Sequence, residues 1–234
     1  MNLIRTLHDY QEQYNKSVTH PENFWADVAN GFFWRKKWDK VLEWDFHKPE
    51  VNWFGGGKLN ITENCLDRHL AKRANQTAII WEPNNPADDA KHITYQQLHN
   101  EVCRAANMLK AHGVRKGDRV CIYLPMIPEL AYTVLACARI GAVHSVVFAG
   151  FSAKSLTDRI NDAGCKIVVT ADGSYRGEKS INLKGIIDEA IESCPQVNTV
   201  IVKEHIRSSP PMQAERDVWW HEAISKVDEV CTAE

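Results

Sequence analysis

Short apolar runs alternate with longer amphipathic segments along residues 121–179, and this pattern predicts a sheet covered by helices. Three apolar runs of strand length lie at residues 120–124, 143–148 and 166–170. The segments between them have apolar residues at helical spacing. Strands that alternate with helices predict parallel strands joined by helical crossovers. We therefore expect an α/β fold whose mostly parallel sheet carries helices on both faces.

Residues 64–113 predict a helix over 64–73, then a hairpin, then a longer helix. Apolar runs at residues 77–81 and 92–95 enclose a turn region rich in Asn, Pro and Asp, which favours a hairpin. Thr94 and Gln97 have the spacing of a capping box, so a helix should begin there and end near Gly113. The apolar residues at helical spacing that would form its buried stripe are Leu98, Val102, Ala105, Ala106 and Leu109.

The second half of the chain continues the alternation. Helices are expected from Pro128 to Gly141 and from Ser152 to Gly164, because Pro and Ser favour helix starts and Gly favours helix ends. A further helix over residues 183–194 precedes a strand at 198–202 and a surface loop at 208–211. Asp217 is expected to cap a final helix that runs to about residue 226.

Residues 1–47 are predicted to be helical and are rich in aromatic side chains. Pro21 suits the first turn of a helix, and the aromatic residues that follow include Phe32, Phe33, Trp34, Trp38 and Trp44. Such a stripe can stack bases, but we expect it to pack this segment onto the main domain. The predicted division is an N-terminal helical and extended segment at residues 1–60 and the first part of a large α/β domain at 61–234.

Two segments that follow predicted strands are candidate binding sites. Ligands of open parallel sheets gather at the carboxyl ends of the strands, where this sequence places Phe148, Ala149, Gly150 and the loop at residues 172–179. In that loop Arg176 offers a planar fork of donors and Lys179 a mobile charge. The loop is therefore either a site for an anionic group or an ordinary polar loop with exposed charges.

Composition narrows the classes of partner and compartment. Lys and Arg number 28 against 30 Asp and Glu, a net charge of −2, which gives no reason to expect nucleic acid or an anionic membrane as partner. Every apolar run is shorter than the roughly 20 residues that span a bilayer, and the polar first residues lack the apolar core of a signal peptide. Seven scattered cysteines without a CxxC pair fit reduced thiols in the cytoplasm and no metal site.

Several catalytic motifs are absent from the sequence. Gly57-Lys58 resembles the end of a phosphate loop, but Asn52 stands where the first Gly belongs and Leu59 where Ser or Thr belongs, so a turn is expected. The sequence has no GxSxG, no HExxH and no GxGxxG after a strand. The cationic stretch at residues 115–118 is interpreted as a solvated turn. These residues alone predict an α/β domain with one plausible anion loop, and not a function.

Longer stretches of the sequence resemble a known family. ARIGAVHSVVFAGFS at residues 138–152 and VVTAD at 168–172 are similar to the AMP-forming acetyl-coenzyme A synthetases of the adenylate-forming superfamily. The other stretches that carry the resemblance lie at residues 53–60, 64–69, 117–120 and 124–129. The resemblance runs from about Tyr14 onward, and it implies that the chain is the N-terminal, incomplete portion of the large domain.

The resemblance implies a ligase reaction with small-molecule substrates. Acetate would attack the α-phosphate of ATP to give acetyl-adenylate and pyrophosphate, and the thiol of coenzyme A would then displace AMP. It also implies that the ATP, Mg²⁺ and acetate sites and the catalytic lysine lie outside this chain, so no catalytic residue is expected within it and it should be inactive alone. The alternatives are a propionyl-coenzyme A synthetase, a truncated non-catalytic nucleotide-binding module and a plain structural domain.

The resemblance also implies a role for the two candidate segments. The family's phosphate-contacting loop matches Arg176, Gly177, Glu178 and Lys179, with Glu178 where the family usually has Gly. Its Phe-Gly-Gly turn matches Phe148, Ala149 and Gly150, with Ala149 in place of one Gly. These seven residues are the predicted site for the nucleotide part of coenzyme A.

Overall fold

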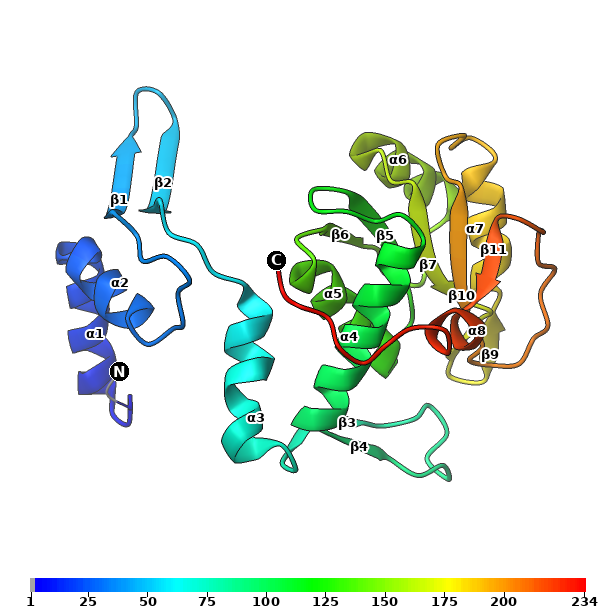
Figure 1. Cartoon of the computed structure of the whole chain (residues 1–234), viewed down its shortest axis with the longest axis horizontal. Helices are drawn as coiled ribbons and strands as arrows, with labels where there is room; N and C mark the ends of the chain where they lie inside the picture. The colour runs from blue at the N-terminus through cyan, green and yellow to red at the C-terminus, as the bar shows by residue number, and fades with distance from the viewer. Residues whose placement is uncertain (1–2) are drawn as a thin grey trace. The chain divides into compact units, whose positions relative to one another are not determined.

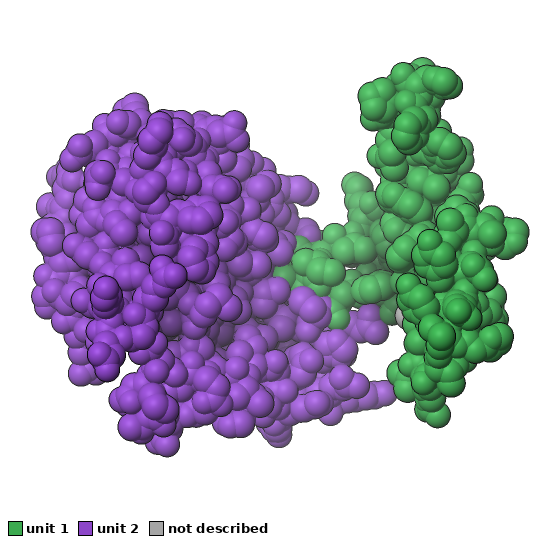
Figure 2. All heavy atoms as spheres, turned by 180° about the vertical axis from the view of Figure 1, so that it is seen from behind, with its two compact units in different colours: residues 1–64 green, residues 65–234 purple. Residues whose placement is uncertain are grey.

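The computed structural model describes residues 3–234, which form two compact units. Residues up to 64 make the first unit and residues 65–234 the second, shown in two colours in Figure 2. The division predicted from the sequence, at residue 60, stays a prediction. No helix among the described residues is both long and apolar enough to cross a membrane.

The first unit contains two helices and a hairpin. Helix α1 (Leu7–Thr19) begins with a capping box between Thr6 and Asp9, and α2 (Pro21–Ala29) begins at the predicted proline. Strands β1 (Lys40–Asp45) and β2 (Glu50–Gly55) then pair antiparallel. The prediction of helix through residue 47 was therefore wrong over β1, because pairing of this segment with β2 overrides its local helical pattern.

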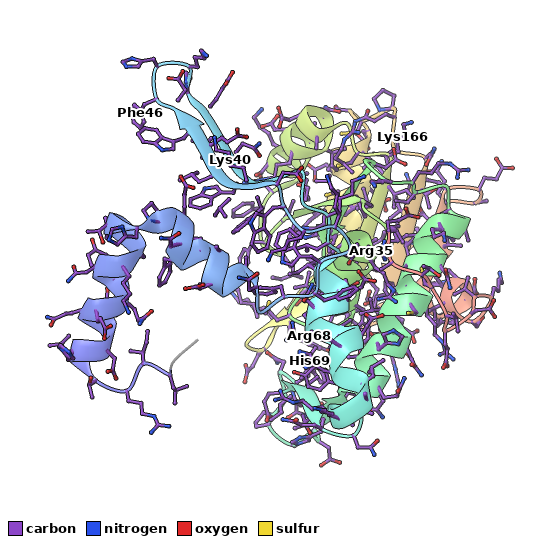
Figure 3. The ribbon with its side chains drawn as sticks, turned by 60° about the vertical axis from the view of Figure 1, so that its left-hand side comes forward. Arg35, Lys40, Phe46, Arg68, His69 and Lys166 are labelled. Atoms are coloured by element: carbon purple, nitrogen blue, oxygen red, sulfur yellow. The ribbon has the colours of Figure 1, made fainter. Side chains whose placement is uncertain are left out.

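Aromatic side chains cluster within the first unit. The rings of Trp34, Trp38 and Phe54 have centroids 4.9–5.5 Å apart and meet edge to face or tilted. Phe46 lies between β1 and β2 in the chain, beyond the strand that Lys40 begins, and is 85% exposed (Figure 3). The stripe predicted from the sequence is thus partly a local cluster, and its packing onto the main domain stays a prediction.

The second unit is built on a five-stranded parallel sheet in the order β11-β10-β7-β5-β6. Its strands are β5 (Arg119–Tyr123), β6 (Val143–Val146), β7 (Ile167–Ala171), β10 (Thr199–Lys203) and β11 (Asp217–Trp219). All five residues of β7 are buried, as expected for a central strand covered on both faces.

Two groups of helices cover the sheet (Figure 1). Helix α4 packs with α5 and α8, and α6 packs with α7. Their bounds are α4 (Tyr95–Ala111), α5 (Pro128–Arg139), α6 (Ala153–Ala163), α7 (Leu183–Ile191) and α8 (Trp220–Ile224). The α/β fold with a parallel sheet and helices is the architecture predicted from the sequence.

Local signals around the longest helix were interpreted correctly. The hydroxyl of Thr94 accepts a hydrogen bond from the backbone N–H of Gln97, and the Gln97 side chain accepts one from Thr94 N–H. The predicted apolar stripe of α4 is buried, and Gly113 has a φ of 87° just beyond the helix. The π-helix η1 (Glu63–Asp67) followed by α3 (Arg68–Arg73) fills the predicted helix, and β3 (Thr77–Trp81) pairs antiparallel with β4 (Lys91–Thr94).

Three predictions in the second half of the chain were wrong. Asp217 does not cap a helix, because its side chain is fully buried in β11 beside Lys184, and Trp219 is the residue before α8. The loop predicted at residues 172–179 is largely a small antiparallel hairpin of β8 (Ser174–Arg176) and β9 (Lys179–Ile181). Strand β6 also ends at Val146 instead of residue 148.

Candidate functional site

The order of the strands defines a switch point at one edge of the sheet. The chain passes from β5 to β6 on one side and then to β7 on the other side of β5. Open parallel sheets bind ligands at the carboxyl ends of strands at such a switch point. A cavity of about 880 Å³ lies beyond β5, β7 and β10, with a lining that includes Trp81, Lys91, Glu129, Tyr175, Gly177, Glu178, Lys203, His205 and Arg207.

The predicted site residues fall into two groups on this edge. Arg176, Gly177, Glu178 and Lys179 form the tip of the β8–β9 hairpin, which follows β7. Gly177 and Glu178 line the cavity, and Arg176 and Lys179 do not. The second group, residues 148–150, follows β6, so β5 separates its strand from β7. The structure therefore brings the first four residues together and places the other three beyond the neighbouring strand.

The hairpin is anchored by the buried carboxylate of Asp172. It accepts hydrogen bonds from the backbone N–H groups of Gly173, His205, Ile206 and Ser208 at 2.7–3.1 Å. Burial alone would raise the pKa of Asp172, but these donors outweigh burial and lower it. The carboxylate thus stays charged and joins the start of the hairpin to the segment that follows β10.

The tip of the hairpin places two cations opposite each other. Arg176 and Lys179 are paired across the turn, and Gly177 has a φ of 62° at the first central position, as a type II′ turn requires. Both cations are exposed, and neither forms an ion pair or a side-chain hydrogen bond with any residue in 3–234. Like charges directly opposite each other are unfavourable, so an anion bound at the tip would relieve their repulsion.

The turn after β6 presents an aromatic ring next to a glycine. Phe148 is 68% exposed, and its carbonyl accepts a 2.8 Å hydrogen bond from Gly150 N–H. A Cβ on Gly150 would lie 2.8 Å from the Cε1 atom of the Phe148 ring, closer than real contacts allow. The turn therefore needs glycine at residue 150 for the ring to keep this position. The exposed ring offers a flat apolar surface at the carboxyl edge of the sheet.

Other walls of the cavity were not predicted from the sequence. The Nδ2 atom of Asn84, in the β3–β4 loop, donates a 3.2 Å hydrogen bond to the carbonyl of Gly177. Lys203, at the end of β10, forms a 3.0 Å ion pair with Glu129. The rule that ligands gather at strand ends would have pointed to Lys203, since a strand was expected to end there. No sequence signal connects Asn84 to the hairpin.

No group of three or more His, Cys, Asp or Glu side chains within residues 3–234 is placed to hold a metal ion. All seven cysteines lie in this range as free thiols. The candidate binding features at the carboxyl edge are the two exposed cations of the hairpin tip and the exposed ring of Phe148.

Comparison with known proteins gives two family matches that together cover most of the chain. The model for AMP-binding enzymes matches residues 66–232, and the model for the N-terminus of acetyl-coenzyme A synthetase matches residues 10–65. The chain superposes on acetoacetyl-CoA synthetase from Streptomyces lividans with a TM-score of 0.84 and 27% identity, over 94% of this chain and 33% of that one. The fold and the sequence therefore point to the same family.

Curated relatives are similar over almost the whole of this chain. An acetyl-coenzyme A synthetase from Saccharophagus degradans is 55% identical over 96% of the chain, and acetyl-coenzyme A synthetase 2 from Pseudomonas aeruginosa is 53% identical over 97%. In both cases the chain spans only 35% of the relative's length. These findings confirm the resemblance seen in the sequence: the chain belongs to the AMP-binding enzyme family and is similar to the N-terminal part of acetyl-coenzyme A synthetases.

Proposed function

We propose that this chain is part of an acetate–CoA ligase. In that reaction acetate attacks the α-phosphate of ATP, which forms acetyl-adenylate and releases pyrophosphate. The thiol of coenzyme A then attacks the acyl carbon, which forms acetyl-coenzyme A and releases AMP. The names of relatives that are 53–55% identical support this assignment, and the free thiols of the chain suit a cytoplasmic enzyme.

The share of the reaction that we assign to this chain is binding of the nucleotide part of coenzyme A. The observation that carries the proposal is the pair of exposed, unpartnered cations at the tip of the β8–β9 hairpin. Arg176 and Lys179 would contact a phosphate, and Gly177 lets the backbone turn tightly between them. Phe148, Ala149 and Gly150 would provide the surface for the adenine and ribose.

Glu178 sets a limit on how the phosphate can approach. Its carboxylate lies at the turn between the two cations and lines the cavity. A negative side chain repels a phosphate, so the phosphate should lie on the side of the hairpin that Arg176 and Lys179 present. Glu178→Gln removes the repulsion and should tighten coenzyme A binding.

The groups of the adenylation step are not assigned to this chain. The resemblance implies Mg²⁺ with ATP, but residues 3–234 hold no cluster of carboxylates or histidines suited to a metal. The chain alone should not catalyse acetate-dependent exchange of pyrophosphate into ATP, and measurable exchange by the purified chain would contradict this part of the proposal.

The affinity for coenzyme A should be low. Two charge-assisted contacts contribute about 3–6 kcal/mol together, whereas association itself costs about 4–15 kcal/mol. We therefore expect a Kd well above about 1 μM, which corresponds to a binding free energy of about −8 kcal/mol.

Titration calorimetry of coenzyme A into the purified chain tests the proposal. Binding should be detectable at high concentration, and Arg176→Ala should weaken it about tenfold or more, since one charge-assisted contact is worth about 1.5–3 kcal/mol. The matched control is Lys154→Ala, which removes an exposed cation from α6 and should leave the affinity unchanged. Equal affinity of the wild-type and Arg176→Ala chains would overturn the assignment.

A further inference from the structure

A second cluster of reactive side chains lies on α4, away from the carboxyl-edge cavity. His99 and Cys103 are one helical turn apart, and the Sγ atom of Cys103 lies 3.7 Å from Nε2 of His99. The same Nε2 lies 3.5 Å from a carboxylate oxygen of Asp67, in η1. The cluster therefore joins a thiol, an imidazole and a carboxylate.

Arg139 connects this cluster to a second cysteine. Its guanidinium donates two 2.9 Å hydrogen bonds to Asp67, and its Nε donates one of 2.7 Å to the carbonyl of Cys231. The Sγ atom of Cys103 lies 3.9 Å from that same carbonyl oxygen. Cys103 and Cys231 are 128 positions apart in the chain, yet the two residues are in contact.

The segment that carries Cys231 runs along α4 and is held there by polar contacts. Asn107 on α4 donates 2.9 Å hydrogen bonds to the carbonyls of Asp228 and Val230. Arg104 forms an ion pair with Glu229. The contact with the buried Arg139 holds Cys231 itself, but the contacts of residues 228–230 lie at the surface. Residues 228–230 can therefore open locally at a lower free energy than the core, and this opening would bring small reagents to the two buried thiols.

The geometry does not support a catalytic triad. In a nucleophile–histidine–carboxylate relay, one ring nitrogen faces the nucleophile and the other faces the carboxylate. Here Nε2 of His99 is the nitrogen nearer to Cys103 and also the one beside Asp67. His99 cannot pass a proton from the thiol to the carboxylate in this arrangement, so hydrolytic chemistry is not inferred.

The charges of the cluster nevertheless favour ionisation of Cys103. The hydrogen bond to Asp67 and the contact with Cys103 raise the pKa of His99 to about 9, so its ring is cationic at neutral pH. Burial would raise the pKa of Cys103, but His99 and Arg139 outweigh burial and lower it. By contrast, burial raises the pKa of Cys121 in the apolar core to about 12.

We propose that Cys103 and Cys231 are a redox-sensitive pair that a hydroperoxide converts into a disulfide, which ties the segment at residues 228–234 to α4. The Cys103 thiolate attacks the peroxide oxygen, the O–O bond breaks, and sulfenic acid and hydroxide form. The thiol of Cys231 then attacks the sulfenic sulfur, the S–S bond forms, and water leaves. The two thiols lose two electrons to the peroxide.

Peptide mapping of the peroxide-treated chain tests this inference. The purified, folded chain is treated with hydrogen peroxide, blocked with iodoacetamide, digested without reductant and analysed by mass spectrometry. The expected result is a cross-linked peptide that contains Cys103 and Cys231 and disappears after dithiothreitol. Cys121 and Cys165 are the internal control and should be recovered as reduced, alkylated thiols.

Variants separate the chemistry from a structural effect. Cys103→Ser and Cys231→Ser should each abolish the cross-link, and His99→Gln should slow its formation several-fold while circular dichroism stays unchanged. Recovery of Cys103 only as a reduced thiol or as sulfinic acid in the wild-type chain would overturn the proposal. So would a disulfide between Cys103 and any cysteine other than Cys231. Because the mapping uses the wild-type chain, neither result depends on whether a variant folds.

Discussion

Two groups of basic side chains in the second unit have opposite surroundings. Lys184 on α7 is fully buried, and its Nζ lies 2.7 Å from Asp188 and 2.8 Å from Asp217. Arg216 contacts the same two carboxylates at 2.7 and 2.6 Å. Arg176 and Lys179, at the tip of the β8–β9 hairpin, are exposed and lack any such partner within residues 3–234.

The difference in burial and pairing distinguishes cations that stabilise the fold from cations that a ligand could contact. A buried cation must be paired, because an unpaired charge in the interior is strongly unfavourable. An exposed cation keeps its hydration and can remain unpaired at little cost. Lys184 and Arg216 therefore hold β11 and the segment before it in place. Arg176 and Lys179 keep their hydration, and under the proposed function they would exchange that water for the phosphate of a ligand.

The largest expected effect comes from breaking the buried group. Asp217→Ala leaves Lys184 and Arg216 with one carboxylate fewer, so the free energy of unfolding should fall by about 3–5 kcal/mol. Urea unfolding followed by tryptophan fluorescence measures the change. Lys154→Ala, which breaks an exposed pair with Asp158, should change it by less than about 0.5 kcal/mol. Similar effects of the two variants would remove the distinction between buried and exposed charges.

His99 provides an intermediate case, paired but titratable. Because Asp67 raises the pKa of His99 to about 9, above its ordinary 6.5, folding favours the charged ring. Its contribution, up to about 3 kcal/mol, is complete below about pH 6.5 and is lost as the pH rises through about 9. The free energy of unfolding should fall over that range in the wild-type chain and less in His99→Gln. An equal dependence of the free energy of unfolding on pH in the wild-type chain and in His99→Gln would contradict the raised pKa of His99.

Removing the exposed cations should affect binding and not stability. Under the proposed function, the double variant Arg176→Ala/Lys179→Ala should lose two charge-assisted contacts with coenzyme A, of about 1.5–3 kcal/mol each. Its free energy of unfolding should stay within about 0.5 kcal/mol of the wild-type value. Calorimetric titration and urea unfolding of the same preparation measure both quantities. A large loss of stability would show that the two cations have structural partners.

The smallest expected effect concerns the shape of the turn that separates the two cations. Gly177 has a φ of 62°, and a Cβ there would meet no atom within 4 Å. Gly177→Ala should therefore lower the free energy of unfolding only by the backbone strain, about 1 kcal/mol. If the spacing of the cations matters, coenzyme A affinity should also fall. An unchanged affinity in calorimetry would show that the hairpin tolerates a different turn.

Signals that act within a few residues were enough to predict much of the fold. The capping box of Thr94 and Gln97 and the left-handed Gly164 after α6 are set by contacts inside a single turn. The apolar stripe of α4 and the buried strands follow from hydrophobic spacing alone. The hairpin tip was also singled out in the sequence, because Arg and Lys flank a glycine just after a strand.

Features set by distant residues could not be predicted. Asp217 has the local pattern of a helix cap, but its partner Lys184 comes from another element. Strand β1 exists because its residues, such as Trp44, pair with β2 residues such as Val51. The cavity wall that Asn84 and Gly177 share joins residues 93 positions apart. Such contacts depend on the tertiary arrangement, and the local pattern of a single sequence does not predict them.

The most direct test of the central claim compares both groups of cations in one experiment. Coenzyme A is titrated into the ¹⁵N-labelled chain, and amide resonances are followed by heteronuclear NMR at concentrations up to saturation. We predict progressive shifts at Arg176, Gly177 and Lys179, and none at Lys184 or Arg216. Shifts confined to the buried group, or no shift at the hairpin at millimolar coenzyme A, would contradict the claim that the unpaired cations form the ligand site.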